Sequence, residues 1–280
     1  MTKKRLIVNA DDYGLTAGVS SGIRRVHLEG ILTSTTALMN RPNVEAELKI
    51  AARECPKLGI GVHLNLTSGE PVLPAEQVPT LMKVLDPHDH GLQQLDMIGQ
   101  LSLAEVEAEW RAQIEKFVRF TGHGPDHLDS HHHSSYYTPE LCTLMLNLAR
   151  EYRCPIRSPF ANPDEPNFIF DDLPAELRDR SKQEVSKILI DAIDVPKPDH
   201  FIADFYDEDV SEETLFRIID NLPEGVSELM THPGYHDSDL TDFSIYNQPR
   251  LRELDLLTSA AVRERLKANQ IELISFGKLK

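Results

Sequence analysis

The sequence predicts an α/β protein, an irregular or incomplete (β/α) TIM-like barrel forming a single domain over residues 1–280. Short apolar runs rich in β-branched residues alternate with stretches whose apolar residues recur every three or four positions, which indicates alternating strands and helices. Seven or eight such units in a chain of 280 residues favour one barrel-sized domain with a parallel sheet over two smaller domains.

The expected elements follow one another along the whole chain. Helical patterns begin at a Ser or Thr cap or end at a glycine, and Trp110 has a core spacing of four residues to both Val106 and Ile114. The expected strands are 5–10, 33–39, 59–66, 126–132, 156–160, 200–206, 226–234 and 271–277, and the expected helices are 16–30, 102–122, 138–152, 180–193, 211–222 and 258–270.

Two proline-rich regions, at about 68–100 and 159–180, interrupt this alternation. Loops of that length in a compact domain are usually functional or without fixed structure. In barrels of this kind the loops after the strands carry the chemistry. Functional residues are therefore expected at the carboxyl ends of the strands.

Composition excludes several classes of partner. With 45 acidic against 29 basic residues the net charge is −16, which disfavours nucleic acid and anionic membrane surfaces. The chain contains neither an apolar run of membrane length nor a signal-peptide core. Cys55, Cys142 and Cys154 are odd in number and lack a CxxC spacing, so neither a disulfide framework nor a zinc knuckle is indicated. We expect a cytoplasmic protein.

Carboxylates and imidazoles lie at the carboxyl ends of four of the expected strands: Asp11 and Asp12, then His63, His131 and His232. Each has a plainer reading by itself, because Asp-Asp-x-Gly and His-Pro-Gly are good turns and a histidine in an apolar run is often a core residue. Their common position at strand ends, where barrel ligands converge, favours one shared site.

The histidine run 131–133 is the densest part of a segment that holds five of the twelve histidines. On a continuing strand, His131 and His133 would share one face and His132 the other. A solvated polar loop is the alternative. Two imidazoles at a strand end suit a metal or an acid–base pair.

One aspartate and two histidines bind a divalent ion while leaving positions open for water and substrate. A further aspartate as base and a further histidine as acid complete the inventory of metal-assisted hydrolysis. We assign the acid to His232, because barrel closure brings late strands beside early ones. A turn histidine that caps the strand is the alternative.

Several motifs of the sequence resemble one family. "LIVNADDYGLTAGVSSGI", "GILTSTTALMN", "IGVHLNLTSGEP", "HLDSHHH", "ELMTHPGY" and "RLRELDLLTSAAV" occur in order, from residue 5 almost to the C-terminus. They look like the YdjC-like carbohydrate deacetylases, and most like the chito-oligosaccharide deacetylases that act in chitin degradation. The resemblance implies an irregular barrel that removes N-acetyl groups from small amino-sugar oligosaccharides with a divalent metal.

The resemblance also implies roles for matching residues. Asp12, His63 and His131 match the metal ligands, Asp11 matches the catalytic base, and Asp129 is a candidate to orient an imidazole. The family pattern often has a further histidine where this chain has Ser135, a difference that bears on substrate preference.

The remaining candidates for substrate contact or support of the site are His133, Arg157 and Tyr235, with Tyr136, Tyr137 and Phe160 as further aromatic residues near strand ends. A packing or surface role is the alternative for each. Mg²⁺ or Zn²⁺ is the expected cofactor and Mn²⁺ or Co²⁺ the alternative, although two histidines suit Mg²⁺ less naturally. A homodimer is one assembly compatible with the sequence.

Two other functions stay open at this stage. A sugar isomerase or a phosphoesterase could use the same barrel and metal. A sugar-binding protein without activity would have no need of an open metal site.

Overall fold

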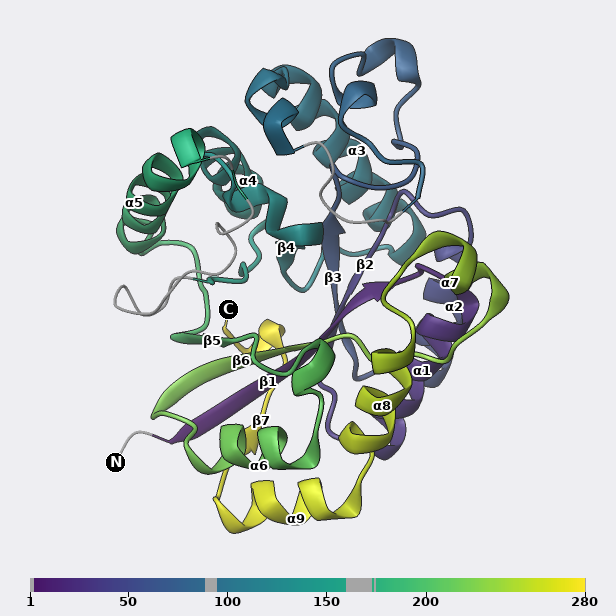
Figure 1. The fold of residues 1–280 in the computed structure, drawn as a ribbon, viewed down its shortest axis with the longest axis vertical. Coiled ribbons are helices and arrows are strands. Elements are labelled where there is room, and N and C mark those ends of the chain that lie inside the picture. Colours follow the sequence, from purple (N-terminus) through teal and green to yellow (C-terminus); the bar gives the residue numbers. More distant parts are fainter. Residues whose placement is uncertain (1–2, 89–94, 160–172, 174, 280) are drawn as a thin grey trace.

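The fold is built on a parallel sheet with β1 at its centre (Figure 1). The computed structural model describes residues 3–88, 95–159, 173 and 175–279. The side chains of β1 are buried from Leu6 onward on both faces, as is typical of a parallel strand covered on both sides. The strands, in order across the sheet, are β4 (Leu128–Ser130), β3 (Gly59–Leu64), β2 (Ser34–Ala37), β1 (Lys4–Tyr13), β6 (Gly225–Thr231) and β5 (His200–Ile202), while β7 (Glu272–Leu273) pairs with the start of β1.

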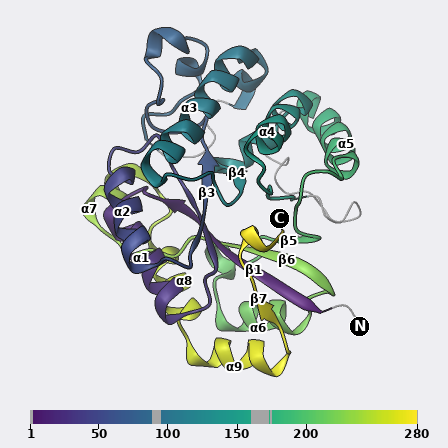
Figure 2. The same ribbon diagram turned by 180° about the vertical axis from the view of Figure 1, so that it is seen from behind.

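The sheet is curled into a half-barrel, and helices cover it. Figures 1 and 2 show α1 and α8 side by side on one flank, α4 and α5 on another, and α6 beside α9 at one end. The predicted barrel is thereby confirmed in its coarser form, a mixed α/β fold around a curled parallel sheet. The helices are α1 (Ala17–Glu29), α2 (Val44–Glu54), α3 (Leu103–Thr121), α4 (Pro139–Tyr152), α5 (Ala175–Asp191), α6 (Glu212–Asp220), α7 (Ser238–Phe243), α8 (Gln248–Leu257) and α9 (Ala260–Ala268).

Local sequence accounts for several helix ends. Thr138 caps α4 by accepting a hydrogen bond from the Leu141 amide, with Pro139 in the first turn, where its missing N–H costs nothing. Helix α3 stops at Gly122, whose φ of 77° lies in the left-handed region that glycine tolerates. Trp110 is fully buried, which confirms its expected core position.

The expected strand at 156–160 is wrong. In the described part of the chain only Ile156 bridges to Leu128 there. Pro155 precedes the segment and Pro159 lies within it. A proline cannot donate to a ladder hydrogen bond, so the pairing does not extend. Phe160 lies outside the described residues.

The histidine run does not continue a strand either. Strand β4 ends at Ser130, and His131 opens a 3₁₀ turn that reaches Tyr136. His132 and His133 have φ values of 52° and 56°, in the left-handed region, so the alternating faces expected for an extended chain do not apply.

One further boundary differs from expectation. Helix α5 begins at Ala175, inside the loop expected over 159–180, where Ala, Glu, Leu and Arg are all strong helix formers. Among the described residues of the region 68–100, short 3₁₀ turns occur at 75–77, 81–83 and 95–100.

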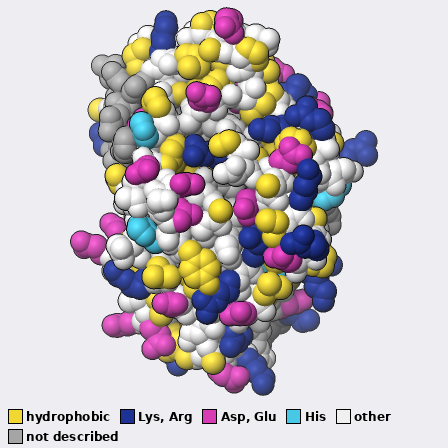
Figure 3. All heavy atoms as spheres, turned by 90° about the vertical axis from the view of Figure 1, so that its right-hand side faces the viewer, with side chains coloured by type: hydrophobic (Ala, Val, Ile, Leu, Met, Phe, Trp, Pro, Cys, Tyr) yellow, Lys and Arg dark blue, Asp and Glu magenta, His cyan; other side chains and the backbone are white. Residues whose placement is uncertain are grey.

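The described helices include none long and apolar enough to cross a membrane. On the face drawn in Figure 3, acidic side chains lie among the basic ones. That mixture agrees with the acidic composition and gives this face no uniformly basic surface for a phosphate backbone.

Candidate metal and active site

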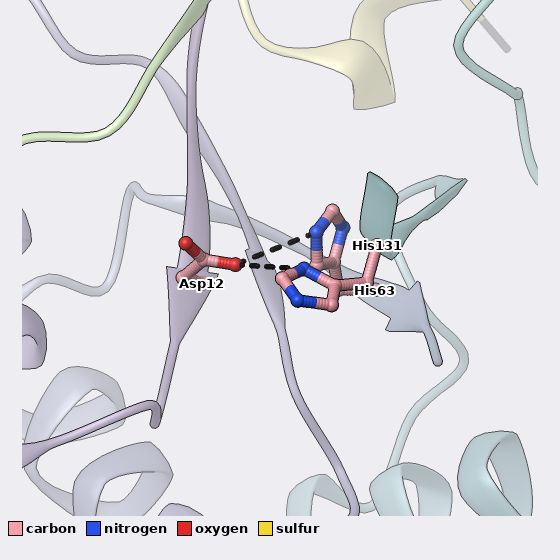
Figure 4. Close-up of side chains that lie close together, drawn as sticks. All are labelled: Asp12, His63 and His131. Carbon is pink, nitrogen blue, oxygen red and sulfur yellow. Dashed lines mark ion pairs between the residues drawn. The ribbon is translucent and has the colours of Figure 1, made fainter. Parts of the chain in front are cut away.

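The three predicted metal ligands, Asp12, His63 and His131, meet at the carboxyl edge of the sheet (Figure 4). They come from the ends of β1 and β3 and from the residue that follows β4. Asp12 Oδ1 lies 3.5 Å from His63 Nε2 and 3.3 Å from His131 Nδ1. All three side chains are buried, and one ligand atom from each lies within 4.8 Å of the others.

The backbone turns at Asp12 to aim its carboxylate. The register between β1 and β2 shifts between Ala10 and Tyr13, and Asp12 has a φ of 71°. A non-glycine residue in the left-handed region is uncommon and clusters at functional sites. The strand is therefore irregular at the residue whose carboxylate faces the two imidazoles.

The Asp12 carboxylate has one oxygen bound and one available. Oδ2 accepts a hydrogen bond of 2.7 Å from Arg250 Nη2, whereas Oδ1 is buried without a hydrogen-bond partner among the described residues. Burial alone would raise the pKa of Asp12, but Arg250, followed by His131 and His63, holds that pKa well below its usual value. A buried anionic oxygen is costly unless a positive group meets it, so the cluster fits a divalent cation.

His63 is oriented by a carboxylate behind it. Its Nδ1 lies 2.6 Å from Asp129 Oδ1, which leaves Nε2 facing Asp12. Asp129 Oδ2 in turn accepts a hydrogen bond of 3.0 Å from the Thr36 hydroxyl. A carboxylate behind a histidine fixes its tautomer and ring plane for metal binding, the position expected for Asp129.

Asp11 points to a different partner from its neighbour Asp12. Arg157 grips it with two hydrogen bonds, 2.7 Å to Oδ2 and 2.6 Å to Oδ1, and Asn9 donates to Oδ1 at 2.8 Å. Burial would raise the pKa of Asp11, but Arg157 outweighs it and keeps the pKa below the usual range. Asp11 is therefore ionised at neutral pH.

Arg157 is fully buried among three carboxylates. Besides Asp11, it lies 2.8 Å from Glu228 and 3.2 Å from Asp129. Burial raises the pKa of Glu228 to about 8 in spite of Arg157, so this carboxyl is largely neutral at pH 7. Of its two expected roles, Arg157 takes the one of holding an acid in place. In a second possible ligand group, Asp11, His63 and Asp129, Arg157 occupies both oxygens of Asp11. Arg250 occupies only one oxygen of Asp12, so the Asp12 group is the better cation site.

His232 lies beside Asp11 at the end of β6. Its Nε2 is 3.8 Å from Asp11 Oδ2, and its backbone N–H donates to Glu253 at 2.5 Å. Burial lowers the pKa of the imidazole to about 4, although Asp11 and Asp12 raise it. The side chain is neutral at pH 7, and with 13% of its surface exposed it is open to a substrate.

The other candidates lie around or away from this centre. His133 faces Phe201 at 5.8 Å between ring centroids, and neither ligand group among the described residues contains it. Tyr136 and Tyr137 are buried, which agrees with packing. Tyr235 contacts α1, where its hydroxyl accepts a hydrogen bond from Arg25.

The sequence-based reasoning missed a group of supporting side chains: Arg250, Glu253, Glu228, Tyr206 and Tyr246. Arg250 and Glu253 lie one helical turn apart on α8. They belong to the motif "RLRELDLLTSAAV", which served above only to show the resemblance to the family. Their full burial as charged residues is the unusual feature, and a charged pair inside an apolar helix pattern was the only available signal.

Comparison with known proteins agrees with this geometry. The family model described as YdjC-like protein matches residues 5–268. The chain belongs to the YdjC-like family. The predicted resemblance is thereby confirmed over nearly the whole length.

Individual relatives of this YdjC-like protein cover it from end to end. A carbohydrate deacetylase of Enterococcus faecalis is 36% identical over 100% of this chain and 99% of its own. A chitooligosaccharide deacetylase of Proteus mirabilis is 33% identical over 98% of each. A crystal structure from Enterococcus faecalis V583, described as a proposed cellobiose-phosphate cleavage protein, has a TM-score of 0.82 at 35% identity over 99% of each chain.

These relatives confirm the expectation that the chain is an enzyme of the deacetylase type. The metal, the sugar, the residue roles, the single-domain division, the homodimer and the cytoplasmic location stay predictions.

Proposed function

We propose that this protein is a divalent-metal-dependent hydrolase that removes N-acetyl groups from small chito-oligosaccharides, diacetylchitobiose or its 6-phosphate, and releases acetate. The observation that carries the proposal is the buried cluster of Asp12, His63 and His131, in which Asp12 Oδ1 lies 3.5 Å and 3.3 Å from the two imidazole nitrogens. Asp11 and His232 lie beside it. The names of the relatives supply the reaction and the class of sugar.

Asp12, His63 and His131 would hold the ion, with Mg²⁺ or Zn²⁺ as the first candidates and Mn²⁺ or Co²⁺ as alternatives. Such an ion acts as a Lewis acid on an acetamide carbonyl and makes water easier to deprotonate. Arg250 and Asp129 keep Asp12 and His63 in position from behind. A water-excluding, rigid setting of this kind strengthens each electrostatic contact with the substrate.

Asp11 is proposed as the proton acceptor. Arg157 keeps it ionised, so a lone pair is available at neutral pH, and the two-point grip fixes the direction of the carboxylate. Oδ2 accepts fewer hydrogen bonds from the protein than Oδ1 does, because Asn9 donates only to Oδ1. It also faces His232, so Oδ2 is the oxygen assigned to take the proton.

His232 is proposed as the group that protonates the leaving amine. Since the ring is neutral at pH 7, it has to gain a proton during the reaction. Asp11 Oδ2 is 3.8 Å from Nε2, within the reach of a small shift or one water, so the proton taken up by Asp11 can pass to His232. The imidazolium then delivers it to the amine nitrogen, and Asp11 returns to its ionised form.

The test is the identity of the product. The metal-loaded protein is incubated with diacetylchitobiose, with and without a 6-phosphate, and acetate and free amine are measured together. Equal amounts of both support the proposal. Released phosphate or an isomerised sugar without acetate would replace it with a phosphoesterase or an isomerase, and binding without any product would indicate a sugar-binding protein.

A further inference from the structure

Three aromatic rings meet beside the catalytic candidates. Tyr206 follows β5, and Tyr246 lies in the segment between α7 and α8. The two tyrosine rings stack in parallel, with centroids 4.5 Å apart and an interplanar angle of 4°. Both stand edge-on to the His232 ring, at 5.4 Å and 5.6 Å, so the pair is in direct contact with the proposed acid.

The stack is fixed by hydrogen bonds at its inner end. The Tyr246 hydroxyl donates to the buried Glu253 at 2.8 Å and accepts from the Asp207 amide at 3.1 Å. Asp207 is the neighbour of Tyr206, so the same hydroxyl pins the backbone that carries Tyr206. Two segments far apart in the sequence thereby hold the rings in one orientation before any ligand arrives.

Tyr206 is exposed in spite of this fixation. Its relative exposure is 43%, which places it among the exposed large apolar side chains. A large ring held rigidly and left open at a site marks a contact surface for a ligand with an apolar face. The neighbouring tyrosines at strand ends do not offer this, because Tyr136 and Tyr137 are buried.

We propose that Tyr206, backed by Tyr246, is the stacking platform for a pyranose ring of the substrate, the ring next to the sugar that carries the scissile acetamide. The inference rests on the proposed function and adds the place of the neighbouring sugar. One face of a pyranose presents C–H groups, which pack on an aromatic face. The 5.4 Å contact to His232 places that sugar one ring away from the group that protonates the amine.

The role belongs to the face of the ring and not to the phenol. The structure gives no hydrogen bond of the Tyr206 hydroxyl within the described residues, whereas the Tyr246 hydroxyl has two. Replacing Tyr206 by phenylalanine therefore keeps the platform, and replacing it by alanine removes it. We expect loss of the platform to cost about tenfold in affinity for the sugar, which corresponds to about 1.4 kcal/mol.

The test measures binding apart from turnover. Metal-loaded Asp11→Asn protein, expected to be slow in turnover, is titrated calorimetrically with diacetylchitobiose and with N-acetylglucosamine. When Tyr206→Ala is introduced into this Asp11→Asn protein, the affinity for the disaccharide should fall about tenfold and that for the monosaccharide should change less than twofold. With Tyr206→Phe, both affinities should stay within twofold of the parent. Ile245→Ala, which removes a 73% exposed apolar side chain next to Tyr246 in sequence, is the matched control and should bind as the parent does.

Acetate release by the wild-type protein is measured alongside, so that the two proposals fail differently. Acetate release with unchanged disaccharide affinity in Tyr206→Ala overturns the platform alone. An equal loss in Tyr206→Phe and Tyr206→Ala overturns it in favour of a contact through the hydroxyl. Absence of both acetate and disaccharide binding in the parent protein overturns the proposed function together with the platform.

Discussion

Asp11 and Asp12 are neighbours in sequence, but their carboxylates contact different partners. Arg157 holds both oxygens of Asp11, while Arg250 holds one oxygen of Asp12 and the other faces two imidazoles. The left-handed φ of Asp12 and the register shift between Ala10 and Tyr13 show that the strand departs from its regular geometry where the two carboxylates part. Adjacent carboxylates can thus serve different tasks.

Exchanging each carboxylate for an amide separates the two tasks. Asp12→Asn should lose metal and activity together, since it removes an anionic ligand. Asp11→Asn should keep its metal and lose turnover by ~10²–10⁴, the usual contribution of a general base. Elemental analysis and initial rates on the two variants decide it. Near-normal turnover in Asp11→Asn, with full metal in Asp12→Asn, would mean that the roles are assigned wrongly.

His232 offers a second test at this scale, because its backbone is held independently of its ring. The hydrogen bond from the His232 backbone N–H to Glu253 does not depend on the imidazole ring. His232→Ala should therefore fold and keep its metal. Removal of the proton donor should lower kcat on the acetamide by ~10²–10⁴. An activated aryl acetate has a leaving group that needs no proton and should lose much less. Equal losses on amide and ester would instead make His232 a substrate-binding residue.

At the scale of elements, α8 links the metal site to the proposed acid. From one helix, Arg250 reaches Asp12 and Glu253 accepts from His232 and from Tyr246. Both ionisable side chains are buried, which is stable only because Arg250 meets the Asp12 carboxylate and Glu253 meets hydrogen-bond donors. The helix therefore connects the carboxyl ends of β1 and β6 through these hydrogen bonds.

Loss of Arg250 should weaken metal binding. Arg250→Met leaves Asp12 buried without its cation, so its pKa rises and its carboxylate is less fixed. We expect metal affinity to fall by about 10–100-fold, the range for partners that orient metal ligands, in titrations against a competing chelator. Arg252→Met on the exposed face of the same helix is the control. Equal metal affinities in the two variants would contradict the role of Arg250 in holding Asp12.

Glu253 predicts a pH dependence of stability. Burial raises its pKa to about 8, from the ordinary value of 4.5 for an exposed glutamate. The folded state thus favours the neutral carboxyl, and its contribution to stability is full below pH 4.5 and is lost as the pH rises through about 8. Glu253→Gln imitates the neutral form, so its Tm should fall less than that of the wild type between pH 5 and 9. Parallel pH profiles would disprove this.

The convergence of the proposed ligands could be predicted from the sequence, because it follows from the topology of a parallel sheet. Parallel strands bring their carboxyl ends to one edge, so Asp12, His63 and His131 had to converge once their strands were located. Arg250 could not be placed in the same way. Its partner Asp12 lies 238 residues away, and the contact depends on how α8 packs against the sheet. Local pattern does not encode that packing.

At the scale of the whole molecule, the first and last parts of the chain close one site. Strand β1 carries the carboxylates, β3 and β4 supply the imidazoles, and β6 with α8 supplies the proposed acid and its supports. The proposed metal would join three of these segments, so its binding should stabilise the entire fold. A ligand present at 100 times its Kd adds about 2.7 kcal/mol.

The central claim is that the Asp12–His63–His131 cluster holds the ion on which deacetylation depends. The most direct measurement is acetate release from diacetylchitobiose by protein stripped with a chelator, before and after addition of Zn²⁺, Mg²⁺, Mn²⁺ or Co²⁺, with His131→Ala alongside. We predict that stripped wild-type protein releases acetate at no more than the background rate, that at least one ion restores release, and that His131→Ala stays inactive. Undiminished release by fully metal-free protein, or full restoration of His131→Ala, would contradict the account.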